Sequence, residues 1–139
     1  MKRKKKDLTK IVFYKMIIVF ILMLIFFFFP DAELFTLAAI AGLIFFILGI
    51  VLLILTLKKK KKNKQRKFLL MTSIGSIGVL AGSILHNLLY AMAILTQETL
   101  LLSWLFEFLH AAFFIFSLIV CPILFIVGTI GTVIHYRKK

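Results

Sequence analysis

Polar side chains that could do chemistry interrupt two apolar runs in the second half of the sequence. They carry imidazole, amide, phenol and carboxylate groups, and they are His86, Asn87, Tyr90, Glu107 and His110. A polar group is costly in lipid unless it faces other protein groups, and a carboxylate is especially costly. We therefore treat these five residues as a candidate polar site inside a membrane.

Three kinds of chemistry fit these groups. A carboxylate beside two imidazoles can exchange a proton near neutral pH, which would suit proton- or cation-coupled transport. Glu107 and His110 have the Glu-x-x-His spacing of carboxylate-bridged metal bundles, but such bundles need two pairs and the sequence has one. His86 and His110 could be the axial ligands of a haem, although a glutamate one turn away does not favour it. Since neither pattern is complete, we predict no metal and no cofactor.

A structural role is the competing interpretation of the same residues. His86 and Asn87 can hydrogen-bond to neighbouring helices and stabilise their packing. Counting back about 20 residues from Thr132, the length of one crossing, places the hydrocarbon boundary near residue 112. Glu107 and His110 would then lie among lipid headgroups, where polar side chains are ordinary.

The elements that must position these residues are membrane-spanning helices. The chain has 139 residues, 63% of them apolar, and its mean hydropathy is +1.11, whereas a soluble domain is about half apolar. A helix needs about 20 residues to cross the hydrocarbon, and it satisfies its own backbone there. We therefore predict an all-α fold, a single transmembrane domain over 1–139, with helices at about 11–29, 34–57, 68–95 and 104–135.

The basic residues predict the direction of these crossings. Seven lie in 2–15, eight in 58–67 and three in 137–139, which accounts for all 18. The first and third connections carry only acidic charge, from Asp31, Glu33 and Glu98. Since cytoplasmic loops are rich in lysine and arginine, we expect both termini and the loop 58–67 to face the cytoplasm of a plasma-membrane protein.

The basic loop has a second predicted role. Basic residues near a bilayer attract anionic lipid headgroups, and they could also bind an acidic cytoplasmic partner. The residues expected to make these contacts are Lys58, Lys59, Lys60, Lys61, Lys62, Lys64, Arg66 and Lys67. Aromatic residues do not alternate with the basic ones, so we predict no nucleic-acid ligand.

A cleavable signal peptide is the alternative interpretation of the first span. Basic residues followed by an apolar run are typical of one. The run is long, however, and Pro30 is unfavourable just before a cleavage site at Ala32. Cleavage would leave three spans with the same orientation.

Small residues predict where the helices touch, because close approach in lipid depends on them. The predicted packing residues of the third and second spans are Gly75, Gly78, Gly82, Ala38, Gly42 and Gly49. The first span has no such stripe, so we expect it to face lipid over most of its surface. Pro122 has no backbone N–H to bond to Leu118, which predicts a kink in the fourth span.

The third and fourth spans form a predicted hairpin that turns at residues 98–100. Matching depths then place His86 opposite 110–112 and Tyr90 opposite 106–108. We therefore expect His86, Tyr90, Glu107 and His110 to converge. Asn87 points about 100° away from His86 and serves another contact.

The function classes follow from what these spans carry. The sequence has no phosphate-binding glycine loop, no nucleophile–base pair and no Cys/His zinc pattern, and its one cysteine is Cys121. This favours a non-enzymatic accessory, regulatory or immunity-type protein, which acts through helix contacts with another membrane protein or a second copy. The alternatives are a small oligomeric transporter that uses the polar cluster, and a haem or metal membrane protein.

Overall fold

The computed structural model describes residues 7–28, 32–59 and 64–137, and these residues are almost entirely helical. The elements are α1 (Leu8–Phe28), α2 (Ala32–Leu57), α3 (Lys64–Leu95), α4 (Leu100–Ile115), η1 (Phe116–Val120) and α5 (Cys121–Arg137). The described residues contain four stretches long and apolar enough to cross a membrane: Leu8–Phe26, Thr36–Leu57, Lys64–Leu95 and Leu100–Arg137. The predicted all-α fold with four membrane helices is confirmed, and the protein is a multi-pass membrane protein.

Two connections are shorter than the sequence suggests. α3 begins at Lys64, so the last residues of the basic loop form its first turn. α4 begins at Leu100 rather than near 104, because the turn between α3 and α4 needs only residues 96–99. The Thr99 N–H closes this turn on the Thr96 carbonyl oxygen at 2.9 Å. Ser103 and Trp104 therefore lie within the helix.

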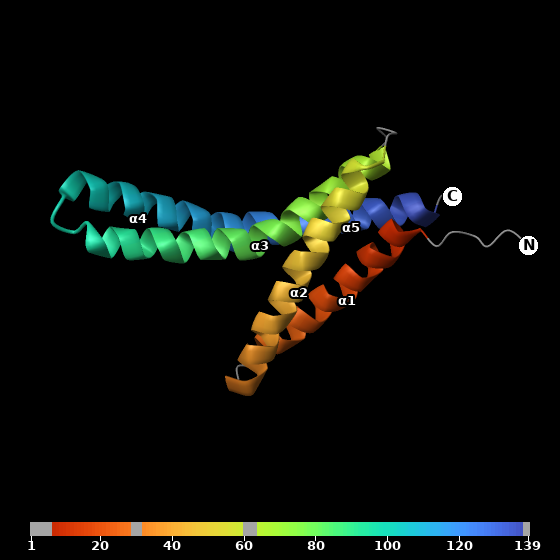
Figure 1. Ribbon diagram of the computed structural model, residues 1–139, viewed down its shortest axis with the longest axis horizontal. Helices are drawn as coiled ribbons and strands as arrows, with labels where there is room; N and C mark the ends of the chain where they lie inside the picture. Colours follow the sequence, from red (N-terminus) through yellow and green to blue (C-terminus); the bar gives the residue numbers. More distant parts are fainter. Residues whose placement is uncertain (1–6, 29–31, 60–63, 138–139) are drawn as a thin grey trace, which may run out of the picture.

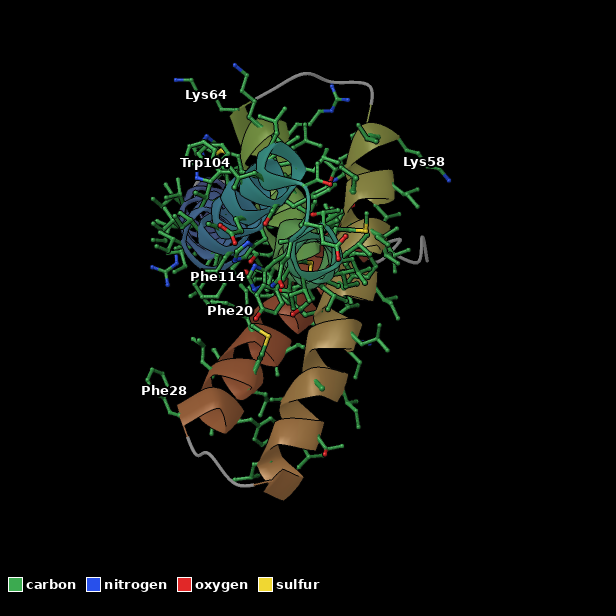
Figure 2. All side chains as sticks on the ribbon, turned by 90° about the vertical axis from the view of Figure 1, so that its left-hand side faces the viewer. Phe20, Phe28, Lys58, Lys64, Trp104 and Phe114 are labelled. Carbon is green, nitrogen blue, oxygen red and sulfur yellow. The ribbon has the colours of Figure 1, made fainter. Side chains whose placement is uncertain are left out.

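The helices form two antiparallel hairpins that meet at one end and diverge at the other (Figure 1). α1 and α2 make the first hairpin, and α3 pairs with α4, η1 and α5 in the second. They meet where α1 begins, α2 ends, α3 begins and α5 ends, which we call the basic end. Seen from the tip of the second hairpin, α1 and α2 run away from α3 and α4, with Phe28 at their far end (Figure 2). The first hairpin therefore covers only the part of the second that lies near the basic end.

The core lies at the crossing of the two hairpins. Its fully buried large side chains are Phe13, Met16, Phe45, Leu52, Leu69 and Phe125. The Phe125 ring touches rings from both helices of the first hairpin, with centroids 4.6 Å from Phe20 and 4.9 Å from Phe45. α1 therefore faces lipid mainly over its second half, while its first half packs into the core.

Short polar side chains line the α3 side of this core. Thr72, Ser73 and Ser76 are completely buried. Each hydroxyl bonds to a carbonyl of its own helix, for example Ser73 Oγ to the Leu69 oxygen at 2.8 Å. A hydroxyl satisfied within its own helix needs no partner across the interface. Neighbouring helices can therefore approach α3 closely.

Candidate functional site

A hydrogen bond between His86 and His110 joins α3 to α4 in the part of the hairpin that α1 and α2 leave uncovered. His86 Nδ1 lies 2.9 Å from the carbonyl oxygen of His110, 24 residues along the chain, and the two ring centroids are 5.2 Å apart. A carbonyl can only accept, so Nδ1 carries the hydrogen and donates it. In the neutral ring, Nε2 is then the nitrogen with a free lone pair.

Two aromatic rings flank this pair. The Tyr90 ring meets the His110 ring edge-on at 5.4 Å, and the Phe114 ring lies 5.0 Å from the His86 ring. His110 Nδ1 is buried and has no hydrogen-bond partner within the part of the chain that the structure describes. Sequence reasoning missed Phe114, although it lies one turn beyond His110 and so faces the same neighbour.

The other two residues of the candidate polar site lie apart from this pair: Glu107, which we expected to converge with it, and Asn87, which we expected to point away. Glu107 is exposed, and among residues 7–28, 32–59 and 64–137 it forms no hydrogen bond or ion pair. Asn87 is also exposed and donates from Nδ2 to the Ser83 carbonyl oxygen at 2.9 Å. Both are exposed because α3 and α4 pack only against each other in this region. Side chains on the sides of these helices that do not face the other helix therefore point outward. The structure thus brings His86, Tyr90 and His110 together and leaves Glu107 and Asn87 outside.

The geometry gives no support to a metal or haem at this place. The described residues contain no group of three or more His, Cys, Asp and Glu side chains that could hold a metal ion. A haem held by two imidazoles needs the porphyrin between their ligating nitrogens. The His86 and His110 rings contact each other directly, which leaves no gap for it.

The glycines of α3 pack against η1 and α5. A Cβ on Gly75 would lie 2.6 Å from the Phe125 amide nitrogen and 2.7 Å from the Cys121 carbonyl oxygen. A Cβ on Gly82 would lie 2.7 Å from Ser117 Cβ, and one on Gly78 would collide with Cys121 Sγ. Only glycine permits this backbone approach.

The small residues of α2 behave differently along its length. A Cβ on Gly49 would collide with the Ser76 hydroxyl of α3, so α2 and α3 approach closely at this glycine. A Cβ on Gly42 would meet nothing within 4 Å, and Ala38 is only half-buried. The hairpins have already diverged there, so α3 does not cover the side of α2 that carries Gly42.

The fourth span changes its helix type just before Pro122. The Cys121 N–H bonds to the Phe116 carbonyl oxygen, five residues back, and residues 116–120 form the π-helix η1. A π turn adds one residue to the helical repeat. It lies directly before Pro122, which has no backbone N–H to continue the ordinary hydrogen-bond pattern. α4 and α5 nevertheless continue in the same general direction (Figure 1). The irregularity at the predicted kink is this π segment.

The basic end holds several charged contacts. Lys59 Nζ pairs with Asp7 at 3.8 Å, and Arg66 Nε donates to the Thr56 carbonyl oxygen at 3.3 Å. Lys10 Nζ lies 5.4 Å from the centre of the Tyr136 ring. Lys58, Lys64 and Lys67 are exposed, while Lys60, Lys61 and Lys62 lie outside the described residues.

A comparison with protein families matches residues 17–86 to DUF308, described as a short repeat of unknown function. The match covers half of the chain. The chain belongs to the DUF308 family. The matched segment runs from α1 through α2 and along α3 to His86, so α4, η1 and α5 lie beyond it. Neither the curated proteins nor the solved structures provide a match.

Similar burial patterns recur in the two hairpins of this DUF308 protein. α1 buries residues 9, 12, 13 and 16, and α3 buries 69, 72, 73 and 76 at the same spacing. α2 buries residues 41, 45, 49, 52 and 56, and the fourth span buries 117, 121, 125, 128 and 132. The second hairpin buries further residues besides these. The segment matched to the family begins within α1 and ends within α3, so it coincides with neither hairpin.

Proposed function

We propose that this protein is an accessory or regulatory membrane protein that binds another membrane protein through its outer arm. The outer arm is the part of the second hairpin beyond the hairpin crossing, residues 83–115, together with η1. It is favoured as the binding surface because the first hairpin leaves it uncovered (Figure 1). Its most exposed side chains are large and apolar, among them Leu95, Leu100, Leu101 and Trp104.

The observation that carries this proposal is an apolar hollow on the outer face of α4 and η1. It has a volume of about 450 Å³ and is lined by Phe108, Ala111, Ala112, Ile115, Phe116 and Val120. A second hollow of about 230 Å³ adjoins it at Ala112, Phe113 and Phe116. Two alanines between aromatic and branched side chains form a depression on a membrane helix.

A transmembrane helix of the partner is the occupant that this hollow fits best. Helix association in lipid depends on close packing at small residues rather than on a hydrophobic driving force. The alanines permit such approach, and the flanking phenylalanine rings provide contact area. The lining residues have no polar side chain, so a charged or polar ligand would find no side chain to pair with.

Photo-crosslinking in intact membranes tests the proposal. A crosslinking amino acid at Ala111 and, separately, at Ile115 should capture the same single protein, because both positions line the hollow. The same probe at Ile126 of α5, which is also exposed, is the matched control and should not capture it. Ala112→Trp fills the hollow and should remove the adduct formed at Ile115. Capture of lipid alone, or equal capture from Ile126, would contradict the proposal.

Anionic lipid at the basic end is a second contact that we propose. A hollow of about 510 Å³ lined by Asp7, Lys10, Ile11 and Tyr14 opens there. Lys58, Lys64 and Lys67 are exposed at the same end. Each basic residue near the surface contributes about 1 kcal/mol to binding an anionic leaflet.

Proton-coupled transport remains the second candidate function. The observation that favours it is the contact between two imidazoles, one of which has a buried nitrogen without a described partner. If it is right, proton flux into liposomes is lost in His86→Ala and His110→Ala, and unchanged flux in both variants rejects it. Glu107→Gln shows separately whether the exposed carboxylate takes part.

A further inference from the structure

The amide of Asn87 is an unsatisfied polar group on the outside of α3. One Nδ2 hydrogen bonds to the Ser83 carbonyl oxygen at 2.9 Å. Oδ1 and the second Nδ2 hydrogen have no partner within the described ranges, and the residue is exposed. Its helix neighbours Ile84 and Leu88 are 59% and 58% exposed, so the amide stands on an apolar surface.

Asn87 lies eight residues inside the end of the membrane span Lys64–Leu95. The apolar run continues beyond it to Leu95, which is 77% exposed. Residues 68–95 are about 40 Å long as a helix, whereas the hydrocarbon is about 30 Å thick. A tilt of about 40° accommodates the run and places Asn87 roughly 9 Å below the outer boundary. Water cannot satisfy the amide at that depth.

The surroundings of Asn87 permit a second helix to approach. Ser83 and Ala91 lie four residues to either side, so all three form one stripe along α3. Both neighbours are small, and the Ser83 hydroxyl is already satisfied by the Val79 carbonyl oxygen at 2.7 Å. The stripe lies on α3, whereas the proposed partner hollow lies on α4 and η1.

We propose that two copies of this chain associate through this stripe, with the Asn87 amides bonded to each other. A symmetric interface places the same residue on both sides. An amide has both a donor and an acceptor, so each Oδ1 can accept from the Nδ2 of the other copy. A second copy thus satisfies both free groups at once.

The dissociation constant of the purified full chain in liposomes tests this proposal. It is measured by energy transfer between labelled copies. Asn87→Leu removes both hydrogen bonds between the two copies and should raise the dissociation constant about 8- to 300-fold, equivalent to roughly 0.6–1.7 kcal/mol for each bond between membrane helices. Asn87→Gln keeps the amide and should retain most of the association. The helix content of both variants should equal that of the unsubstituted chain, because the side chain contacts nothing in the core.

Cysteine crosslinking identifies the face. In a Cys121→Ser background, Ala91→Cys should form a disulfide between copies on oxidation in lipid. Met92→Cys is the matched control at the same depth, because it is exposed on another side of α3. Three results would each overturn the proposal. They are a chain that is monomeric at all ratios of lipid to protein, an Asn87→Leu variant that associates like the unsubstituted chain, and equal crosslinking at Met92→Cys and Ala91→Cys. The proposal would also be overturned if Asn87→Leu stopped binding a different membrane protein while both the variant and the unsubstituted chain were monomeric.

Discussion

Single residues decide how closely the helices of this protein approach. Gly75 lies where the α5 backbone passes within contact of α3, while Gly42 has open space around it. Both are glycines on a stripe of small residues, and the sequence alone predicts a helix contact at each of them. The difference lies in the neighbouring helix. α5 runs alongside α3 at Gly75, whereas Gly42 lies in the part of α2 that is far from α3.

Gly75→Ala and Gly42→Ala form a matched pair that tests this difference. A Cβ at Gly75 must displace backbone atoms of Phe125 and Cys121, so the free energy of unfolding should fall by about 1–3 kcal/mol. Gly42→Ala meets no atom and improves helix propensity, so the stability should stay unchanged or rise by up to about 1 kcal/mol. Thermal unfolding of the detergent-solubilised protein measures both. Equal losses in the two variants would show that α5 does not lie against Gly75.

At the scale of elements, the π segment sets how the two halves of the fourth span face α3. Cys121 and Phe125 face Gly75 on the α5 side of the segment, and His110 faces His86 on the α4 side. One residue more or fewer between them would rotate α4 by about 100° relative to α5. The extra residue of the π turn therefore allows both contacts to form in one helix.

Deletion of Ile119 tests the role of the π segment. Ile119 is exposed, so its loss removes no core contact, but it restores the ordinary helical repeat. With α5 held by the glycines, α4 should rotate and separate His110 from His86. The readout is crosslinking of His86→Cys with His110→Cys by a short bifunctional thiol reagent in a Cys121→Ser background. The crosslink should form in the full-length chain and be lost in the deletion; its persistence would mean that α5 rotates instead.

For the whole molecule, the arrangement of two hairpins gathers all the described basic residues at one end. The starts of α1 and α3 and the ends of α2 and α5 lie together there, while the turn at 96–99 lies at the far end of the outer arm (Figure 1). This agrees with the sidedness that the charges predict. Which side of the membrane the basic end faces is a prediction from the positive-inside rule.

Labelling of single cysteines in intact cells tests the sidedness. In a Cys121→Ser background, Glu98→Cys should react with an impermeant thiol reagent added outside, because it lies in the exposed turn between α3 and α4. Asn63→Cys, in the basic loop, should react only after the membrane is permeabilised. If Asn63→Cys reacted from outside and Glu98→Cys only after permeabilisation, the topology would be the opposite of the predicted one. The tip of the outer arm would then face the cytoplasm.

The sequence by itself determined the number of spans, the helical class and the level of His86 opposite His110. Each follows from hydrophobic length and from the turn between two antiparallel spans, which are local properties. It did not show that Phe13 and Met16 enter the core, that Gly42 stays open or that Glu107 faces outward. Only the tertiary structure decided these, because they depend on where the two hairpins cross. In lipid nearly every face of a helix is apolar, so hydrophobic pattern cannot tell a helix-facing side from a lipid-facing one.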